Sequence, residues 1–279
     1  MKVPAFGSLF LTSLTLAACG GGGGGTSTPT SNPPPATESA VGLWKGTITS
    51  TGSGQTQQAL GTVTDDGQFH VMTANGVNYV GQMAASPANF SMTMSGYVPV
   101  GQTFPNGAQN GSMSFSGTVT SSGMMSGTYS GAGESGTFSM TMDPMGTRSA
   151  SMQMVAGTYT RSNSSGYTVT MTVDSNGQMT GSDTQGCVFN GTVSVPFPAH
   201  NFYGMNTTVT SCGALNGSYN GMGTLVDANA MTSWMTVMMS SMMTGGMMGG
   251  MNAVPTGTNN LFMYSMANGQ MAITDSIAK

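Results

Sequence analysis

The stretch FSMTMS, from Phe90 to Ser95, places Phe90, Met92 and Met94 on one side of an extended chain and Ser and Thr on the other. The stretch FSMTMD at 138–143 repeats this order, and TVTMTV at 168–173 has the same alternation. An apolar residue at every second position is typical of an antiparallel strand with one buried and one solvated face. These runs, which lie in different parts of the chain, predict that strands build the fold.

Short polar segments that contain glycine separate the alternating runs. They are DDGQ at 65–68, TANG at 73–76, SSG at 121–123 and DSNG at 174–177. Glycine supplies the backbone conformations that a tight turn between two strands requires. Short strands joined by such turns, without a sustained helical period, predict an all-β fold, either an antiparallel β-barrel or a sandwich.

The strand pattern occurs twice along the chain. VTDDGQFHVMTANGVNYVGQ at 63–82 aligns with TVDSNGQMTGSDTQGCVFNGT at 172–192, with glycines in matching places. VTSSGMMSGTYSG at 119–131 matches VTSCGALNGSYNG at 209–221, and we assign the extra length of the first copy to residues 98–111. We therefore expect two tandem homologous β units, at 41–147 and 154–279. The repeat leaves open whether they are two domains or two halves of one barrel.

Charged residues make up only 5% of the chain, against about 25% in an ordinary soluble domain. The polar surface must therefore come mostly from Ser, Thr, Asn and Gln. The net charge is −4, and it becomes −5 if an N-terminal segment that contains Lys2 is removed. Without a basic patch, nucleic acid is excluded as an expected partner.

The N-terminus has the features of a secretion signal. Lys2 precedes the short apolar run AFGSLFLTSLT at 5–15, which is too short to span a bilayer. This run is followed by Leu16-Ala17-Ala18-Cys19, which resembles the lipobox of bacterial outer-membrane lipoproteins. An ordinary signal peptide with a chance cysteine is the alternative. The Gly-, Pro-, Ser- and Thr-rich segment at 20–40 is typical of a disordered tether.

The lipoprotein resemblance implies a location and a partner. Residues 1–19 would be the signal peptide and its lipidation site, and Cys19 would carry the acyl chains that insert into membrane lipid. In that family an Asp after the cysteine retains the protein at the inner membrane, whereas this chain has Gly20. The resemblance therefore implies a lipid anchor in the outer membrane, on the periplasmic or the surface face.

Two cysteines remain if Cys19 is lipidated. Cys187 and Cys212 form an even pair, which in an oxidising compartment predicts one disulfide. A metal site with two thiolate ligands is the alternative. It lacks a histidine or carboxylate at the usual ligand spacing in the sequence.

Methionine is unusually frequent, with 29 residues. Most of these residues lie on the apolar phase of a strand, where Met can replace Leu or Ile as a core residue. The segment 242–251 has no strand phase and carries Met242, Met243, Met247, Met248 and Met251 between pairs of glycines. Thioethers suit Cu(I), so a copper site is one hypothesis for this loop. The others are an oxidisable loop without a ligand and a contact with a partner or with lipid.

The first β unit opens with Gly42-Leu43-Trp44, and the second with Gly157-Thr158-Tyr159. The Gly-x-Trp start resembles the opening motif of lipocalins and related calycin barrels. That resemblance implies a cup for a small apolar ligand, and such a pocket would be lined by aromatic residues such as Trp44, Phe69, Phe90 and Tyr159. A filled interior would instead favour a structural or interaction module.

The remaining motifs do not indicate catalysis. GAGESG at 131–136 fits G-x-G-x-x-G, but a strand follows it, so we interpret it as a hairpin turn. His70 and His200 lack an acid or nucleophile nearby in sequence, and we expect them on the surface or at a strand edge. The Asp residues at 65, 66 and 174 lie in turns that need no calcium.

We therefore expect an anchored, non-catalytic binding module or envelope interaction module without a cofactor. Its partner would be an envelope protein, an envelope polymer or a small ligand. Copper handling through the methionine loop and lipocalin-like transport of an apolar ligand are the alternatives.

Overall fold

The computed structural model describes residues 39–83, 88–163, 165–227 and 260–279. Residues 37–279 belong to one compact unit. Cys19, the tether up to residue 38 and the methionine segment at 242–251 lie outside the described residues, so the lipidation and copper hypotheses stay predictions. The predicted end of the tether at residue 40 is wrong, because Ala40 is fully buried in the core of the first barrel.

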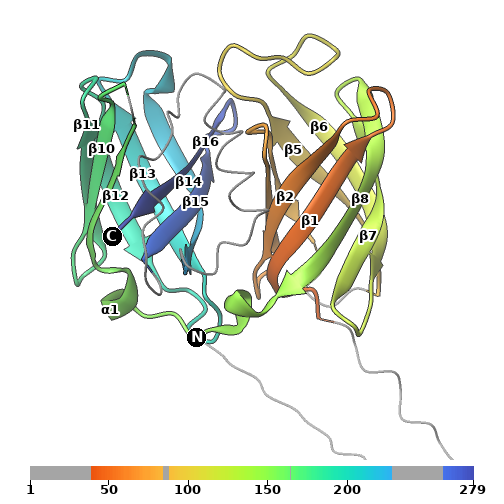
Figure 1. Ribbon diagram of the computed structural model, residues 1–279, viewed down its shortest axis with the longest axis horizontal. Coiled ribbons are helices and arrows are strands. Elements are labelled where there is room, and N and C mark those ends of the chain that lie inside the picture. The colour runs from red at the N-terminus through yellow and green to blue at the C-terminus, as the bar shows by residue number, and fades with distance from the viewer. Residues whose placement is uncertain (1–38, 84–87, 164, 228–259) are drawn as a thin grey trace, which may run out of the picture. The chain divides into compact units, whose positions relative to one another are not determined.

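The first eight strands form a closed antiparallel barrel in which each strand pairs with its neighbour in sequence (Figure 1). Pairing of β1 with β8 closes the barrel. The strands are β1 (Gly42–Ser50), β2 (Thr56–Val63), β3 (Gln68–Thr73), β4 (Asn78–Gln82), β5 (Asn89–Tyr97), β6 (Asn110–Val119), β7 (Met124–Gly131) and β8 (Glu134–Asp143).

The next eight strands form a second closed antiparallel barrel of the same strand order. They are β9 (Gly157–Ser162), β10 (Thr168–Val173), β11 (Gln178–Asp183), β12 (Val188–Ser194), β13 (Tyr203–Thr210), β14 (Gly217–Val226), β15 (Leu261–Ala267) and β16 (Ala272–Ala278). The predicted all-β fold with two tandem units is confirmed. The units are two separate barrels, and not halves of one.

In the described residues, helix is confined to short segments between strands. They are the 3₁₀ helix η1 (Pro144–Thr147) and helix α1 (Met152–Val155), which connect the barrels, and the 3₁₀ helix η2 (Gly213–Leu215). None of the helices in the described parts of the chain has the length and hydropathy that a membrane crossing would need.

The predicted strand phase is confirmed by burial. Phe90, Met92 and Met94 are buried in β5, whereas the Ser and Thr residues between them are exposed. Val169 and Met171 are likewise buried in β10, where Thr170 between them is partly exposed. Methionine therefore does the work of an aliphatic core residue in both barrels, where its flexible side chain fills the gaps between aromatic rings.

The matching glycines of the repeat occupy matching tight turns. Gly67 has φ of 82° and Gly177 has φ of 84°, a left-handed conformation that glycine adopts without strain. A Cβ on Gly67 would lie 2.1 Å from the carbonyl oxygen of Met83, and one on Gly177 would lie 2.3 Å from that of Val193. Any side chain at either position would displace the neighbouring backbone.

The sequence match between 119–131 and 209–221 aligns two hairpins that occupy different positions in the strand order of their barrels. Residues 119–131 contain the β6–β7 turn, whereas 209–221 contain the β13–β14 turn, which corresponds in strand order to β5–β6. The match is therefore displaced by one strand. The displacement is possible because successive hairpins share the same alternating pattern and glycine turns, so their local sequences resemble one another.

The opening motifs perform the same task in each barrel. Trp44 Nε1 donates to the carbonyl oxygen of Ala40 at 2.8 Å, and the Tyr159 hydroxyl donates to that of Val155 at 2.7 Å. Both rings are fully buried, and both bonds reach back four residues. In each barrel the aromatic residue of the first strand is therefore hydrogen-bonded to the segment that precedes this strand.

An apolar cluster forms on the outer faces of strands from both barrels. Leu60 in β2 and Met72 in β3 belong to one buried cluster with Val226 in β14 and Leu261 and Met263 in β15. Because β15 buries its other face in the second barrel, every residue of LFMYSM is buried. These strands therefore depart from the alternation seen elsewhere, and the barrels share a dry contact.

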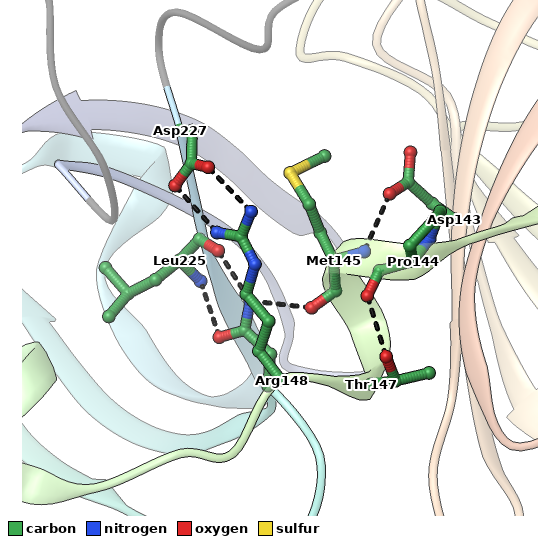
Figure 2. Close-up of polar contacts among 8 residues, drawn as sticks. Asp143, Pro144, Met145, Thr147, Arg148, Leu225 and Asp227 are labelled. Atoms are coloured by element: carbon green, nitrogen blue, oxygen red, sulfur yellow. Dashed lines mark hydrogen bonds and ion pairs between the residues drawn. The ribbon is translucent and has the colours of Figure 1, made fainter.

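Several polar groups near this contact have hydrogen-bond partners that lie far away in the sequence. Asn78 Oδ1 accepts hydrogen bonds from Ser265 Oγ at 3.0 Å and from Thr274 Oγ1 at 2.6 Å. Arg148, in the connection between the barrels, makes two hydrogen bonds to the carboxylate of Asp227, at 2.7 and 2.6 Å (Figure 2). Charge-assisted pairs of this bidentate form are geometrically specific, so they fix how the connection meets the second barrel.

Candidate functional site

A hollow of about 600 Å³ opens at the mouth of the second barrel, where β9 leads into β10. Its apolar lining includes Val169, Phe189, Leu215, Tyr264 and Ile273. The β3–β4 turn of the first barrel also reaches its rim. The volume falls within the usual range of about 300–1,000 Å³ for small-molecule pockets, and such pockets often occupy the mouths of β-barrels.

A buried ion pair lies in this hollow. Arg161 in β9 is 5% exposed and Asp275 in β16 is 8% exposed. Arg161 Nη2 donates to Asp275 Oδ2 at 3.0 Å, and Nε lies 2.9 Å from Oδ1. Arg161 Nε and Nη1 are both buried, and neither has a hydrogen-bond partner within the described chain. A buried donor of this kind is costly unless something binds to it, because it has lost its water.

Burial and the charge of the partner shift the pKa of each group of this pair in opposite directions. Burial lowers the pKa of Arg161, but the neighbouring Asp275 carboxylate more than offsets this effect, so the guanidinium stays protonated. Burial raises the pKa of Asp275, and the guanidinium opposes the rise by favouring the ionised carboxylate. Asp275 Oδ1 also accepts the backbone N–H of Ser276 at 2.7 Å, which further favours the ionised form.

The ion pair stands at the seam where the second barrel closes. In the first barrel β1 and β8 pair from Leu43 to Ser50. In the second barrel β16 and β9 share one residue pair, Ala278 with Thr160. Beyond it, the side chains of Arg161 and Asp275 connect the two strands where the backbone ladder does not. The hollow therefore lies beside the least tightly closed part of the barrel.

A second polar pair lies opposite the guanidinium. The Tyr167 hydroxyl donates to Asp183 Oδ2 at 3.0 Å, and Arg161 lies over the Tyr167 ring, 5.3 Å from its centroid. Burial, followed by the nearby Asp183 carboxylate, raises the pKa of Tyr167. Burial likewise raises the pKa of Tyr264. Both phenols are therefore neutral at physiological pH, and both residues line the hollow.

The mouth of the first barrel has a different character. Its hollow, about 640 Å³, includes Tyr79, Tyr129 and Glu134, and the Tyr79 hydroxyl donates to Glu134 Oε1 at 3.3 Å. Burial raises the pKa of Glu134, although its side chain is only half-buried. Below it, a cluster of aromatic rings that includes Phe115 and Phe138 fills the barrel. This hollow holds no deeply buried charge.

The residues proposed for an aromatic pocket do not form one. Trp44, Phe69, Phe90 and Tyr159 are buried in the two cores, and none of them lines either mouth. Sequence reasoning missed the polar residues that do line the second mouth. The signal was present, because Arg161 follows Tyr159 on the inward phase of a strand and Asp275 lies between Ile273 and Ile277 on another.

The predicted disulfide is confirmed. Cys187 is bonded to Cys212, so the bridge links the turn before β12 to the connection after β13, at the rim of the hollow. Asp183 places an oxygen within 4.8 Å of both sulfur atoms, so a carboxylate does lie near the cysteines. In the disulfide the sulfur atoms are bonded to each other and provide no thiolates for a metal.

Removing the disulfide is expected to lower stability substantially. The bridge spans 25 residues, and closing a loop of this length is worth roughly 3 kcal/mol in the chain-entropy model. We expect the double variant Cys187→Ser/Cys212→Ser to lose about this much unfolding free energy in urea titrations. A loss below about 1 kcal/mol would mean that the loop stays ordered in the unfolded chain without its bridge.

The histidines lie away from the hollow, and their surroundings differ from expectation. His70, expected at the surface or a strand edge, is 6% exposed in a groove of about 460 Å³ that residues of both barrels line. Its Nδ1 has no hydrogen-bond partner within the described chain. His200 Nδ1 lies 2.8 Å from Asp65 Oδ2, an acid 135 positions away in sequence. Sequence spacing could not reveal that pair.

His70 is expected to make the protein acid-sensitive. Burial lowers its pKa from 6.5 to about 4, although the nearby Asp66 carboxylate opposes the change. The unfolded chain therefore takes up a proton first as the pH falls. The contribution of neutral His70 to the free energy of unfolding is complete above pH 6.5. It decreases as the pH falls from 6.5 to 4, by about 3 kcal/mol in total.

The test compares urea unfolding of the wild type and of His70→Asn across that pH range. We expect the difference in unfolding free energy between the two proteins to narrow as the pH falls. A difference that stays constant would show that His70 does not change its protonation between the folded and unfolded states. The raised pKa values of Glu134 and Asp275 change stability with pH in the opposite direction. Both proteins contain these residues, so their effect cancels in the difference.

The protein contains two eight-stranded antiparallel barrels. The mouth of the second barrel is partly enclosed and combines apolar walls with a buried ion pair. Comparison of the chain with family models, with curated proteins and with solved structures gives no match. The function must therefore be argued from the site itself.

Proposed function

We propose that this protein is a non-catalytic binding protein whose second barrel holds a small ligand in its mouth. The observation that carries the proposal is the hollow of about 600 Å³ that combines apolar walls with the buried Arg161–Asp275 pair. Pockets that bind small molecules typically combine a mainly apolar lining with a few polar groups that fix orientation. Among the described residues, the lining of the first barrel's mouth has no buried ion pair, so the second mouth is the better candidate.

Binding explains the lining better than catalysis does. The carboxylate of Asp275 is held by Arg161, and that of Asp183 accepts from Tyr167, so each acid already has a partner. Neither histidine is among the residues that line the hollow. A general base or activated nucleophile needs a free group within hydrogen-bond reach of its substrate. The arrangement holds a molecule in place without offering it such a group.

Nile red, a neutral apolar dye whose emission rises and shifts to the blue on leaving water, tests the proposal. We expect saturable binding of one dye per chain. The variant Ile273→Trp places a larger ring in the lining and should weaken binding at least tenfold, because the new ring takes the space of the dye. Gln57→Trp adds the same ring to the hollow of the first barrel and is the matched control.

The two variants give opposite expectations. Gln57→Trp should bind the dye as the wild type does, and circular dichroism should show that both variants are folded. Wild-type protein that leaves the dye emission unchanged, or an Ile273→Trp variant with unaltered affinity, would reject the second mouth as the binding site.

We also propose that the barrels are attached to the outer membrane by acyl chains on Cys19. The support is the segment Leu16-Ala17-Ala18-Cys19 with the Gly-, Pro- and Ser-rich stretch that follows it. A tether of this composition would let the barrels move freely near the membrane. Cell fractionation of Cys19→Ser tests the anchor, since a variant that remains in the membrane fraction would disprove it.

A further inference from the structure

We infer that the ligand of the second barrel is an uncharged amphiphile whose carbonyl oxygen accepts a hydrogen bond from Arg161. The inference rests on the proposed function and specifies the chemistry of the same hollow. Three features of the hollow carry it: a free buried donor, the charge of the lining and the distribution of apolar groups.

The free donor calls for an acceptor. Arg161 donates to Asp275 through Nη2, and Nε lies 2.9 Å from Oδ1 without forming a hydrogen bond. The buried Nη1 also has no hydrogen-bond partner within the described chain. A guanidinium has only donors, so the group that satisfies Nη1 must be an acceptor such as a carbonyl, ether or hydroxyl oxygen. Because the guanidinium is 5% exposed, a bound oxygen would replace water that burial has removed.

The charge of the lining argues against an anion. Arg161 is the only basic residue among those that line the hollow, and its charge is already balanced by Asp275. Asp183 adds a further negative charge that no basic residue balances there. A carboxylate or phosphate ligand would therefore enter a lining with net negative charge and meet repulsion from it. Specificity often depends on such a repulsive element as much as on attractive contacts.

The apolar groups define the rest of the ligand. Val169, Phe189, Leu215 and Ile273 provide aliphatic and aromatic wall around the polar centre, and the disulfide lies at the rim. A ligand that carries an apolar chain or ring would bury it against these walls, which is the main source of affinity for small molecules in such pockets. A fully polar ligand such as a free sugar would leave these walls in contact with water.

Two ligands of the same chain length, one neutral and one charged, test this inference. Octanamide and octanoate have the same chain length, and at neutral pH only octanoate is charged. We expect octanamide to bind the wild-type protein at least tenfold more tightly than octanoate in isothermal titration calorimetry. Displacement of bound Nile red by octanamide places both in the same hollow.

The role of Arg161 is tested with a variant that removes both charges of the pair. Arg161→Met/Asp275→Leu avoids leaving one charge buried without its partner, and apolar replacement of a whole buried pair is often neutral for stability. This variant should keep Nile red binding but bind octanamide at least tenfold more weakly. The matched control is Arg148→Met/Asp227→Leu, which removes another Arg–Asp pair outside the hollow (Figure 2) and should bind octanamide normally.

The outcomes separate the two proposals. If neither Nile red nor octanamide binds, the proposed function is wrong. If Nile red binds and Ile273→Trp abolishes its binding, but octanoate binds as tightly as octanamide, the function stands and the inference about charge is wrong. Octanamide affinity that is unchanged in Arg161→Met/Asp275→Leu would likewise overturn the role of Arg161.

Discussion

Asp275→Asn is expected to lower the free energy of unfolding by about 3–5 kcal/mol, one of the largest effects of any conservative substitution in this chain. The variant keeps the size of the side chain and an oxygen that can still accept the N–H of Ser276. It removes the charge that balances Arg161, whose guanidinium is 5% exposed and cannot lose its proton. An uncompensated buried charge costs about this much in proteins where one partner of a buried pair was removed.

The double variant Arg161→Met/Asp275→Leu provides the comparison. Since it leaves no buried charge, it should recover most of the stability that Asp275→Asn loses, and urea unfolding of the three proteins measures the differences. The comparison separates an effect of the unbalanced charge from an effect of packing. A double variant that is no more stable than Asp275→Asn would show that the loss comes from packing, and not from an unbalanced charge.

Trp44→Ala is expected to destabilise the protein by a similar amount, about 3–5 kcal/mol. The indole ring is fully buried in the core of the first barrel, so its removal forfeits a large apolar area and leaves a cavity. The substitution also leaves the carbonyl oxygen of Ala40 without the 2.8 Å hydrogen bond that fastens the entering chain to β1.

Phenylalanine substitutions separate these two contributions. Trp44→Phe keeps an aromatic ring in the core but removes the N–H donor, and Tyr159→Phe removes only the hydroxyl donor at the matching place in the second barrel. The loss of one such bond is typically worth about 1 kcal/mol. We expect Tyr159→Phe to lose about that much in thermal or urea unfolding. A wild-type stability for Tyr159→Phe would mean that water satisfies the Val155 carbonyl in its place.

Much of the fold could be predicted from local sequence because each strand carries its own signal. In β5 the alternation of Phe90, Met92 and Met94 with hydroxyl residues defines both the strand and its buried face. Glycines such as Gly67 and Gly177 mark turns because their backbone angles and close contacts exclude side chains. These are short-range constraints, and a single sequence contains them in full.

Long-range pairing could not be predicted in the same way. Every hairpin has a similar pattern, so the match between 119–131 and 209–221 does not reveal that it is displaced by one strand. Whether the chain forms one barrel or two depends on whether β8 pairs with β1 or with a later strand. That choice is made by side-chain packing across the whole barrel.

The candidate site was the least predictable part. Its polar residues come from strands at opposite ends of the second unit, since Arg161 lies in β9 and Asp275 in β16. Only closure of the barrel brings these side chains together. Their sequence signal is a charged residue on an otherwise apolar strand phase, which indicates a buried charge but does not name its partner. The contact between His200 and Asp65 could not be predicted either, because it joins connections of the two different barrels.

Because a single residue pair joins β9 and β16, we expect the second barrel to open locally at this seam. Backbone groups on both sides of that pair are free of the cooperative ladder that holds the other strands, so we expect their amide protons to exchange with deuterium through small local fluctuations. Such fluctuations would admit a ligand from the side, between the strands, without disturbing the loops above. The inward charges at the same edges also discourage another chain from adding a strand there, which keeps this flexible border from becoming a site of aggregation.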